Sequence, residues 1–203
     1  MDKIELKDKH DEMINNIIEK ETEIAEEIAI IIIKCYEETE QDFDALYDDI
    51  LDLIYISLKQ TYKMTISQAK KIYKALQKEK IDDKKITKAE INNYTYSKDK
   101  LTLAQRVKQY IDKAKEGKIN KDVLIFYETR ILDNETLVLH HKLLKSKLME
   151  NGVMYGMIVA GGGCDRECCN ASKEEWMPLE EIEDPPYHPN CTCEIVYDDS
   201  IDG

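Results

Sequence analysis

Apolar residues recur every three or four positions between residues 12 and 38. They are Ile14, Ile17, Ile18, Ile24, Ala25, Ile28, Ile31, Ile32 and Cys35. Because an α-helix repeats every 3.6 residues, this spacing predicts a long helix with one apolar stripe that packs against other elements. Cys35 lies on that stripe, and we expect it to be a small buried side chain, as unreactive cysteines often are.

A second helix is predicted over residues 41–63, where seven apolar side chains share one side: Phe43, Leu46, Tyr47, Ile50, Leu53, Ile54 and Leu58. The helix also carries three carboxylates that we expect to form a solvated face: Asp48, Asp49 and Asp52. Ser67 is a good N-cap residue, so a third helix is predicted from there to about residue 78.

Residues 81–100 are polar and charged, and we predict a connection that contains a short helix at 86–93. This connection divides the chain. An N-terminal helical region is expected over 1–80, and the helical part of a second region over 101–152. A Cys/His-rich β/loop module with an acidic tail is expected over 153–203.

Two further helices are predicted after the connection, at 103–115 and 121–150. Gly117 suits the end of the first helix. Asn120 can cap the second helix, and Gly152 ends it. Two histidines in the middle of the second helix are expected at its surface or at an interface: His140 and His141.

After Gly152 the pattern changes to that of strands. Residues 153–160, VMYGMIVA, and 191–197, CTCEIVY, are rich in β-branched and aromatic side chains and predict two strands. A long connection without periodicity, such as 164–190, is usually tied down by something. We therefore expect the two strands to pair as an antiparallel ladder at its base. The expected fold is mainly α, with long helices and a small, β-hairpin-like, metal-stapled C-terminal module.

The 203-residue chain has a formal net charge of −13. Direct nucleic-acid binding is not expected, because a phosphate backbone requires clustered Lys and Arg. Docking on anionic lipid is disfavoured for the same reason.

The first residues hold no apolar core like that of a signal peptide. The strongest apolar run, Ile28–Ile33, is shorter than the roughly 20 residues of a membrane span. We expect a cytosolic origin, reduced thiols and no membrane partner.

Five of the six cysteines and one histidine gather between residues 161 and 197. In a reducing compartment such a cluster indicates metal ligands rather than disulfides. Structural zinc takes four nitrogen or sulfur ligands, often as two close pairs. The first pair is Cys164 with either Cys168 or Cys169. The second pair is His188 with Cys191, or Cys191 with Cys193.

We predict a structural zinc site made of Cys164, Cys168, His188 and Cys191, with Cys169 and Cys193 as alternates. The spacing leaves two alternatives open: a cluster of reduced thiols without metal, or disulfides formed after release into an oxidising medium. Residues 164–203 hold 12 Asp and Glu against two basic residues. Such a tail has few large apolar side chains, and metal ligation would supply folding free energy that it cannot obtain from a core.

The cysteine segment lacks the companions that catalysis requires. A thiol nucleophile needs an orienting His and an acid, and the nearest histidine, His188, is better used as a ligand. Gly161–Gly163 is followed by Cys, not by the Lys-Ser/Thr of a phosphate-binding loop. Residues 1–100 contain no Gly and a single histidine, His10, so a tight nucleotide pocket is hard to build there. We do not expect an enzyme.

The pattern C-D-x-x-C…N…W…H-P-N-C-x-C resembles the C-terminal signature of phage head-morphogenesis proteins, the Mu F-like minor head (minor capsid) proteins. The matching residues are Cys164, Cys168, Asn170, Trp176, Pro186, His188, Pro189, Asn190, Cys191 and Cys193. Residues 127–159 are similar to the helix that leads into a strand in this family, and the resemblance covers about 100–197. The sequence departs from the family at Thr192, where Arg is usual, and in lacking an Asn-Gly turn after Asn170.

The resemblance implies a structural or assembly protein of a tailed-phage or prophage head. It implies contact with the portal protein, the major capsid protein or both. It also implies a place in the virion after a stage in the host cytoplasm. Self-association is left open. The alternative is a toxin or effector enzyme domain that carries a phage-type C-terminal module.

Overall fold

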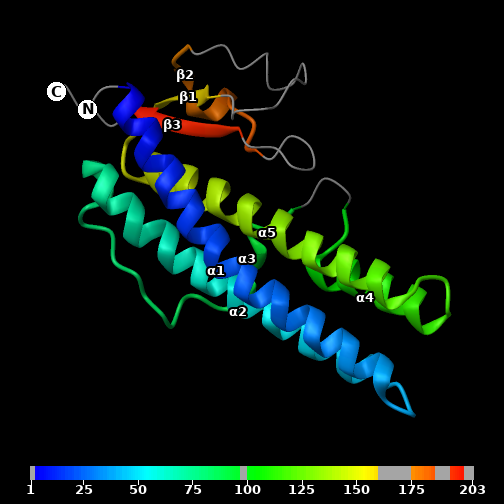
Figure 1. Cartoon of the computed structure of the whole chain (residues 1–203). Helices are drawn as coiled ribbons and strands as arrows, with labels where there is room; N and C mark the ends of the chain where they lie inside the picture. Colours follow the sequence, from blue (N-terminus) through cyan, green and yellow to red (C-terminus); the bar gives the residue numbers. More distant parts are fainter. Residues whose placement is uncertain (1–2, 97–99, 160–174, 186–192, 199–203) are drawn as a thin grey trace.

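A computed structural model of the protein describes residues 3–96, 100–159, 175–185 and 193–198. The elements along the chain are α1 (Lys3–Glu37), α2 (Phe43–Ile72), the 3-10 helix η1 (Lys74–Leu76), α3 (Lys88–Asn92), α4 (Leu103–Lys115), α5 (Lys121–Glu150), β1 (Tyr155–Val159), β2 (Met177–Pro178), the 3-10 helix η2 (Leu179–Glu181) and β3 (Glu194–Asp198). Figure 1 shows long helices lying side by side, with the small sheet at the end of the bundle that holds the first turns of α1.

The first two helices, α1 and α2, form an antiparallel hairpin (Figure 1). The Asp42 carboxylate caps α2 by accepting hydrogen bonds from two backbone amides of its first turn. The prediction that a separate helix begins at Ser67 was wrong, because α2 runs without a break to Ile72. No Gly or Pro precedes Ser67 to end the helix, and buried Ile66 and Ala69 continue its apolar stripe.

The later helices follow the predicted bounds closely. Thr87 caps α3, inside the predicted 86–93 interval. Thr102 and Gln105 form a capping box at the start of α4. Asn120 caps α5 as predicted, and α5 continues unbroken until the left-handed Gly152, whose φ is +88°. These ends were predictable because caps and glycine stops are local signals.

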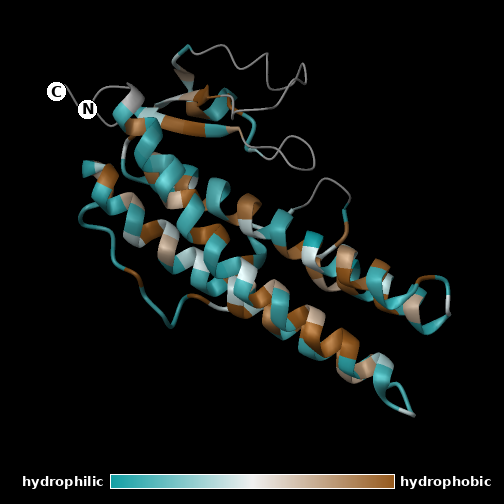
Figure 2. Cartoon of the chain, viewed as in Figure 1, coloured by the Kyte–Doolittle hydropathy of each residue, from teal (hydrophilic) through white to brown (hydrophobic). Residues whose placement is uncertain are grey.

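One buried apolar cluster joins α1, α2, α4 and α5, with Ile28, Ile50, Val107 and Leu139 among its members. Helices on both sides of the 81–100 connection therefore contribute to the same core. Figure 2 shows the hydrophobic and hydrophilic positions alternating around these helices. Two smaller predictions are confirmed: Cys35 is buried, and the α2 carboxylates, which are Asp48, Asp49 and Asp52, are exposed.

The sheet has the strand order β2-β1-β3, and both pairings are antiparallel. The predicted ladder between the two C-terminal strands is confirmed: β1 and β3 pair over five residues, from Tyr155 opposite Asp198 to Val159 opposite Glu194. The two-residue strand β2 was not predicted, because it is too short to show an alternating pattern. The fold is thus mainly helical with a small three-stranded antiparallel sheet.

Within the described ranges, no helix combines the length and the apolar character needed to cross a membrane.

Candidate functional site

The β1–β3 ladder places the two ends of the cysteine segment next to each other. Val159, the last residue of β1, lies opposite Glu194, the first residue of β3. Cys193 comes directly before Glu194 and is 2% exposed. A buried thiol therefore lies at the end of the ladder from which both ends of the segment leave. Such a position suits a soft sulfur ligand that is shielded from water.

The other predicted ligands, Cys164, Cys168, Cys169, His188 and Cys191, lie outside the described residues. Within the part of the chain that the structure describes, no three His, Cys, Asp or Glu side chains are grouped so that they could hold a metal ion. The choice among the predicted ligands therefore rests on their spacing in the sequence, with Cys193 as the one whose surroundings are known.

The sheet is seated on the bundle through an apolar cluster. Leu6 and Met13 of α1 and Leu148 of α5 pack with Met157 of β1 and Val196 of β3. Each of these side chains is nearly or completely buried. Burial of apolar side chains is the main force that holds one layer of a domain on another. The C-terminal module is thus joined to the bundle by a continuous core.

Three aromatic rings meet inside this contact. His10 of α1, Tyr73 after α2 and Tyr197 of β3 lie with ring centroids 5.5 to 6.1 Å apart. His10 Nε2 and the Tyr73 hydroxyl share a hydrogen bond, and the Tyr197 backbone amide donates to the same hydroxyl over 3.4 Å. Burial lowers the pKa of His10 to about 4, against a smaller opposing effect of Asp11. His10 is therefore a neutral hydrogen-bonding residue at pH 7.

A carboxyl pair forms a second contact between α1 and β3. Burial first, and then the hydrogen bond to Asp11 and its charge, raise the pKa of Glu194 to about 8. Burial also acts to raise the pKa of Asp11, but hydrogen bonds with Glu194 and Lys7 outweigh it and lower that pKa. Lys7 Nζ lies 2.6 Å from the Asp11 carboxylate. At pH 7 the Asp11–Glu194 pair therefore holds one proton, and the hydrogen bond that this proton makes links α1 to β3.

Lys145 of α5 fixes the segment between β2 and β3. Its ammonium donates to the backbone carbonyl of Ile182 and lies 3.3 Å from the Asp184 carboxylate. Both charged side chains are largely buried. A second link joins the Leu179 amide to the Met154 carbonyl over 2.9 Å. The described residues between the two cysteine-bearing stretches are therefore held by polar contacts to α5 and to the residue before β1.

His140 and His141, predicted to lie at a surface or interface, are buried inside α5. The Thr65 hydroxyl is 2.9 Å from His140 Nδ1. Burial is the main cause that lowers the pKa of His141 to about 3 and holds the pKa of His140 well below its usual value. A sequence signal did exist, since both histidines lie one turn before the buried residues Leu143 and Leu144. Neither histidine lies at the surface, because neighbouring elements cover this part of α5.

Comparisons of this chain with protein-family models, with curated proteins and with solved structures each returned no match.

Proposed function

We propose that this protein is a structural component that assists assembly of a tailed-phage or prophage head, as a minor head protein. Its helical body would make protein contacts, and zinc would stabilise its C-terminal module. The observation that carries the proposal is the β1–β3 ladder with buried Cys193 at its end. The ladder frames the same segment whose Cys, His and Trp pattern resembles that of minor head proteins.

The ladder also supports the zinc site on energetic grounds. Pairing β1 with β3 brings the two ends of the cysteine segment together. The strand contacts therefore offset part of the conformational entropy that is lost when this long loop closes. Zinc held by Cys164, Cys168, His188 and Cys191, with Cys169 or Cys193 as alternates, would then supply the remaining folding free energy. Such a closed site is structural, because all four positions are filled by the protein.

A non-enzymatic role agrees with the nature of the described polar clusters. The side chains of His10, Tyr73 and Glu194 are buried between elements, and Asp11 is partly buried. A substrate could reach His10 only if the sheet left the bundle. The proposed partners are the portal protein and the major capsid protein, with a virion location after assembly in the host cytoplasm.

Metal content tests the zinc part of the proposal. Purified full-length protein should contain about one zinc per chain, and His188→Ala and Cys191→Ser should abolish it. Cys35→Ser removes a thiol from the bundle core and serves as the matched control, which should keep its zinc. Metal-free protein with a disulfide between the two halves of the segment would contradict the zinc site.

Co-purification tests the role in the phage head. A tagged chain, expressed from the phage or prophage that encodes it, should be recovered with the portal or major capsid protein and in purified particles. Recovery in neither would contradict the proposal. Turnover of a nucleotide by the isolated monomer would favour the toxin or effector alternative instead.

A further inference from the structure

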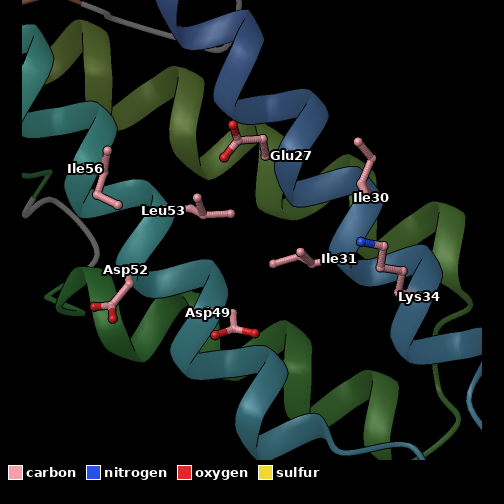
Figure 3. A pocket seen from close by; sticks show the side chains of 8 residues that line it. All are labelled: Glu27, Ile30, Ile31, Lys34, Asp49, Asp52, Leu53 and Ile56. Atoms are coloured by element: carbon pink, nitrogen blue, oxygen red, sulfur yellow. The ribbon is translucent and has the colours of Figure 1, made fainter.

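A groove of about 400 Å³ lies between α1 and α2, far along the helices from the sheet. Four residues of each helix line it: Glu27, Ile30, Ile31 and Lys34 from α1, and Asp49, Asp52, Leu53 and Ile56 from α2. Figure 3 shows Ile31 and Leu53 pointing toward each other across the groove. On both helices the lining positions follow a spacing of three, four and seven residues, so each helix contributes one continuous face.

The apolar side chains of the groove are unusually accessible. Ile30 and Ile56 are each 49% exposed, and Ile31 and Leu53 are only partly buried. Single exposed apolar side chains are common on protein surfaces, but four that face one hollow between two helices form a shared patch. Grooves between paired helices commonly accept the apolar face of a third helix.

The rim of the groove is acidic. Glu27 and Asp49 are exposed, and no described residue forms an ion pair with either. Asp52 pairs with Lys88 over 2.6 Å, and Lys34 is the single cation among the lining residues. The charge extends beyond the lining: residues 19–58 hold 13 Asp and Glu against two Lys, a formal −11 of the −13 of the whole chain.

We propose that this groove is the docking site for a basic amphipathic helix of a partner protein. The helix would place apolar side chains, spaced by three or four residues, on Ile30, Ile31, Leu53 and Ile56. Lys or Arg on its flanks would face Glu27 and Asp49 and speed the encounter by long-range attraction. The inference does not depend on the phage-head role, because it rests on the shape, polarity and charge of this face alone.

A second copy of the chain is a poorer occupant than such a helix. Two chains of net charge −13 repel each other. The most basic stretch of the chain, residues 70–88, has eight Lys against three acidic residues. Within the described structure, however, that stretch exposes no large apolar side chain that could fill the groove.

The test uses the full chain and a fluorescent Lys/Leu peptide of about 14 residues, which is long enough for about four helical turns with one apolar face. A peptide of identical composition with a scrambled order has the same charge and no apolar face. Fluorescence anisotropy at about 0.15 M NaCl, where surface charges are largely screened, should show binding of the amphipathic peptide at least about tenfold tighter than of the scrambled one.

Variants locate the binding. The double substitution Ile30→Gln/Ile56→Gln should weaken binding of the amphipathic peptide by about tenfold or more. Asp49→Asn should make that binding less dependent on salt. Ile18→Gln, at another exposed isoleucine of α1, is the matched control and should change binding less than about twofold. All these positions are exposed, so the helical circular dichroism signal should be unchanged.

Three results would overturn the proposal. They are the absence of binding, equal binding of the scrambled peptide, and an equal loss in Ile18→Gln. Self-association that competes with the peptide and is lost in the Ile30→Gln/Ile56→Gln variant would assign the groove to a second copy instead. None of these outcomes affects the zinc measurement, so failure here and failure of the proposed phage-head role are distinguishable.

Discussion

At the scale of single residues, Gly156 of β1 is closely surrounded by side chains of the C-terminal module. A Cβ atom at this position would lie 2.5 Å from Leu179 Cδ2, 3.1 Å from Ile195 Cγ2 and 3.2 Å from Ile182 Cδ1. The absence of a side chain therefore lets η2 and its following residue close over β1. The requirement for glycine here is steric, since the backbone of Gly156 is that of an ordinary strand.

Gly156→Ala should destabilise the protein by about 1–3 kcal/mol, because three packed side chains must move. Urea denaturation monitored by the Trp176 fluorescence and by circular dichroism measures the change. In a Leu179→Ala background the same substitution should cost much less, since the closest atom is gone. Equal costs in the two backgrounds would contradict the packing argument.

His10 gives the protein a specific dependence on pH. Its pKa in the folded state is about 4, below the ordinary value of about 6.5. Between these values the unfolded chain binds a proton that the folded chain does not. Stability from this group is therefore fully present above about pH 6.5 and is lost as the pH falls toward 4.

His10→Gln keeps a hydrogen-bonding group beside Tyr73 but cannot titrate. Between pH 7 and pH 5, the wild type should lose roughly 1–2 kcal/mol more of its free energy of unfolding than this variant. The raised pKa of Glu194 makes the folded state more stable as the pH falls over this range, which is the opposite of the effect of His10. Because Glu194 is present in both proteins, the difference between the two curves reports His10 alone. Parallel curves for wild type and variant would show that His10 is not buried as a neutral group.

At the scale of elements, the chain between α3 and α4 is held by a buried ion pair. The Arg106 guanidinium of α4 donates to the Glu135 carboxylate of α5 and to the Tyr96 carbonyl. Glu135 also accepts from the Tyr96 amide over 2.9 Å. Lys142 donates to the Thr95 carbonyl over 2.7 Å. These contacts, rather than local helix or strand structure, position the end of the connection.

Glu135→Gln should destabilise the protein by about 2–4 kcal/mol, because Arg106 then stays buried without its counter-charge. Chemical denaturation measures the loss. Asp112→Asn breaks the exposed pair with Lys108, whose atoms are 2.9 Å apart, and is the control that should cost less than about 1 kcal/mol. Similar costs for both substitutions would mean that burial of the Arg106–Glu135 pair is unimportant.

At the scale of the whole molecule, the bundle has one apolar cluster of its own, and a second cluster joins the sheet to it. Among the described residues, the main apolar cluster is built from side chains between Ile24 and Leu143. The second cluster attaches the sheet to the bundle ends. If the proposed zinc site stabilises the sheet, the bundle, which has a core of its own, should stay folded when the metal is removed.

Removal of zinc with a chelator should leave the helical circular dichroism signal nearly unchanged. Amide hydrogen exchange in β1 and β3 should accelerate by about tenfold or more, because the proposed zinc would no longer hold the two ends of the cysteine segment together. Added zinc should restore the slow exchange. Unchanged exchange in the strands, or loss of the helices together with the sheet, would contradict this division of the molecule.

Much of the fold could be predicted from the sequence because its signals are local. The apolar stripe of α1, the caps at Thr102 and Asn120, and the glycine after α5 depend only on neighbouring residues. The strand character of residues 153–160 and 191–197 correctly predicted an antiparallel pair. The zinc ligands were chosen in the same way, from residue type and spacing, and they stay a prediction.

Only the tertiary structure decided which polar side chains are inside. α5 contacts α1, α2 and α4, so nearly all of its circumference near His140 is covered, and even the Glu128 carboxyl is buried. Conversely, Ile18 belongs to the apolar stripe predicted for α1, yet it is 42% exposed. Local signals in the sequence determined where most helices and the strands β1 and β3 lie, but they missed the start of α1 at Lys3 and the continuation of α2 past Ser67. Burial depends on how many neighbours surround an element, and that is a property of the assembled bundle.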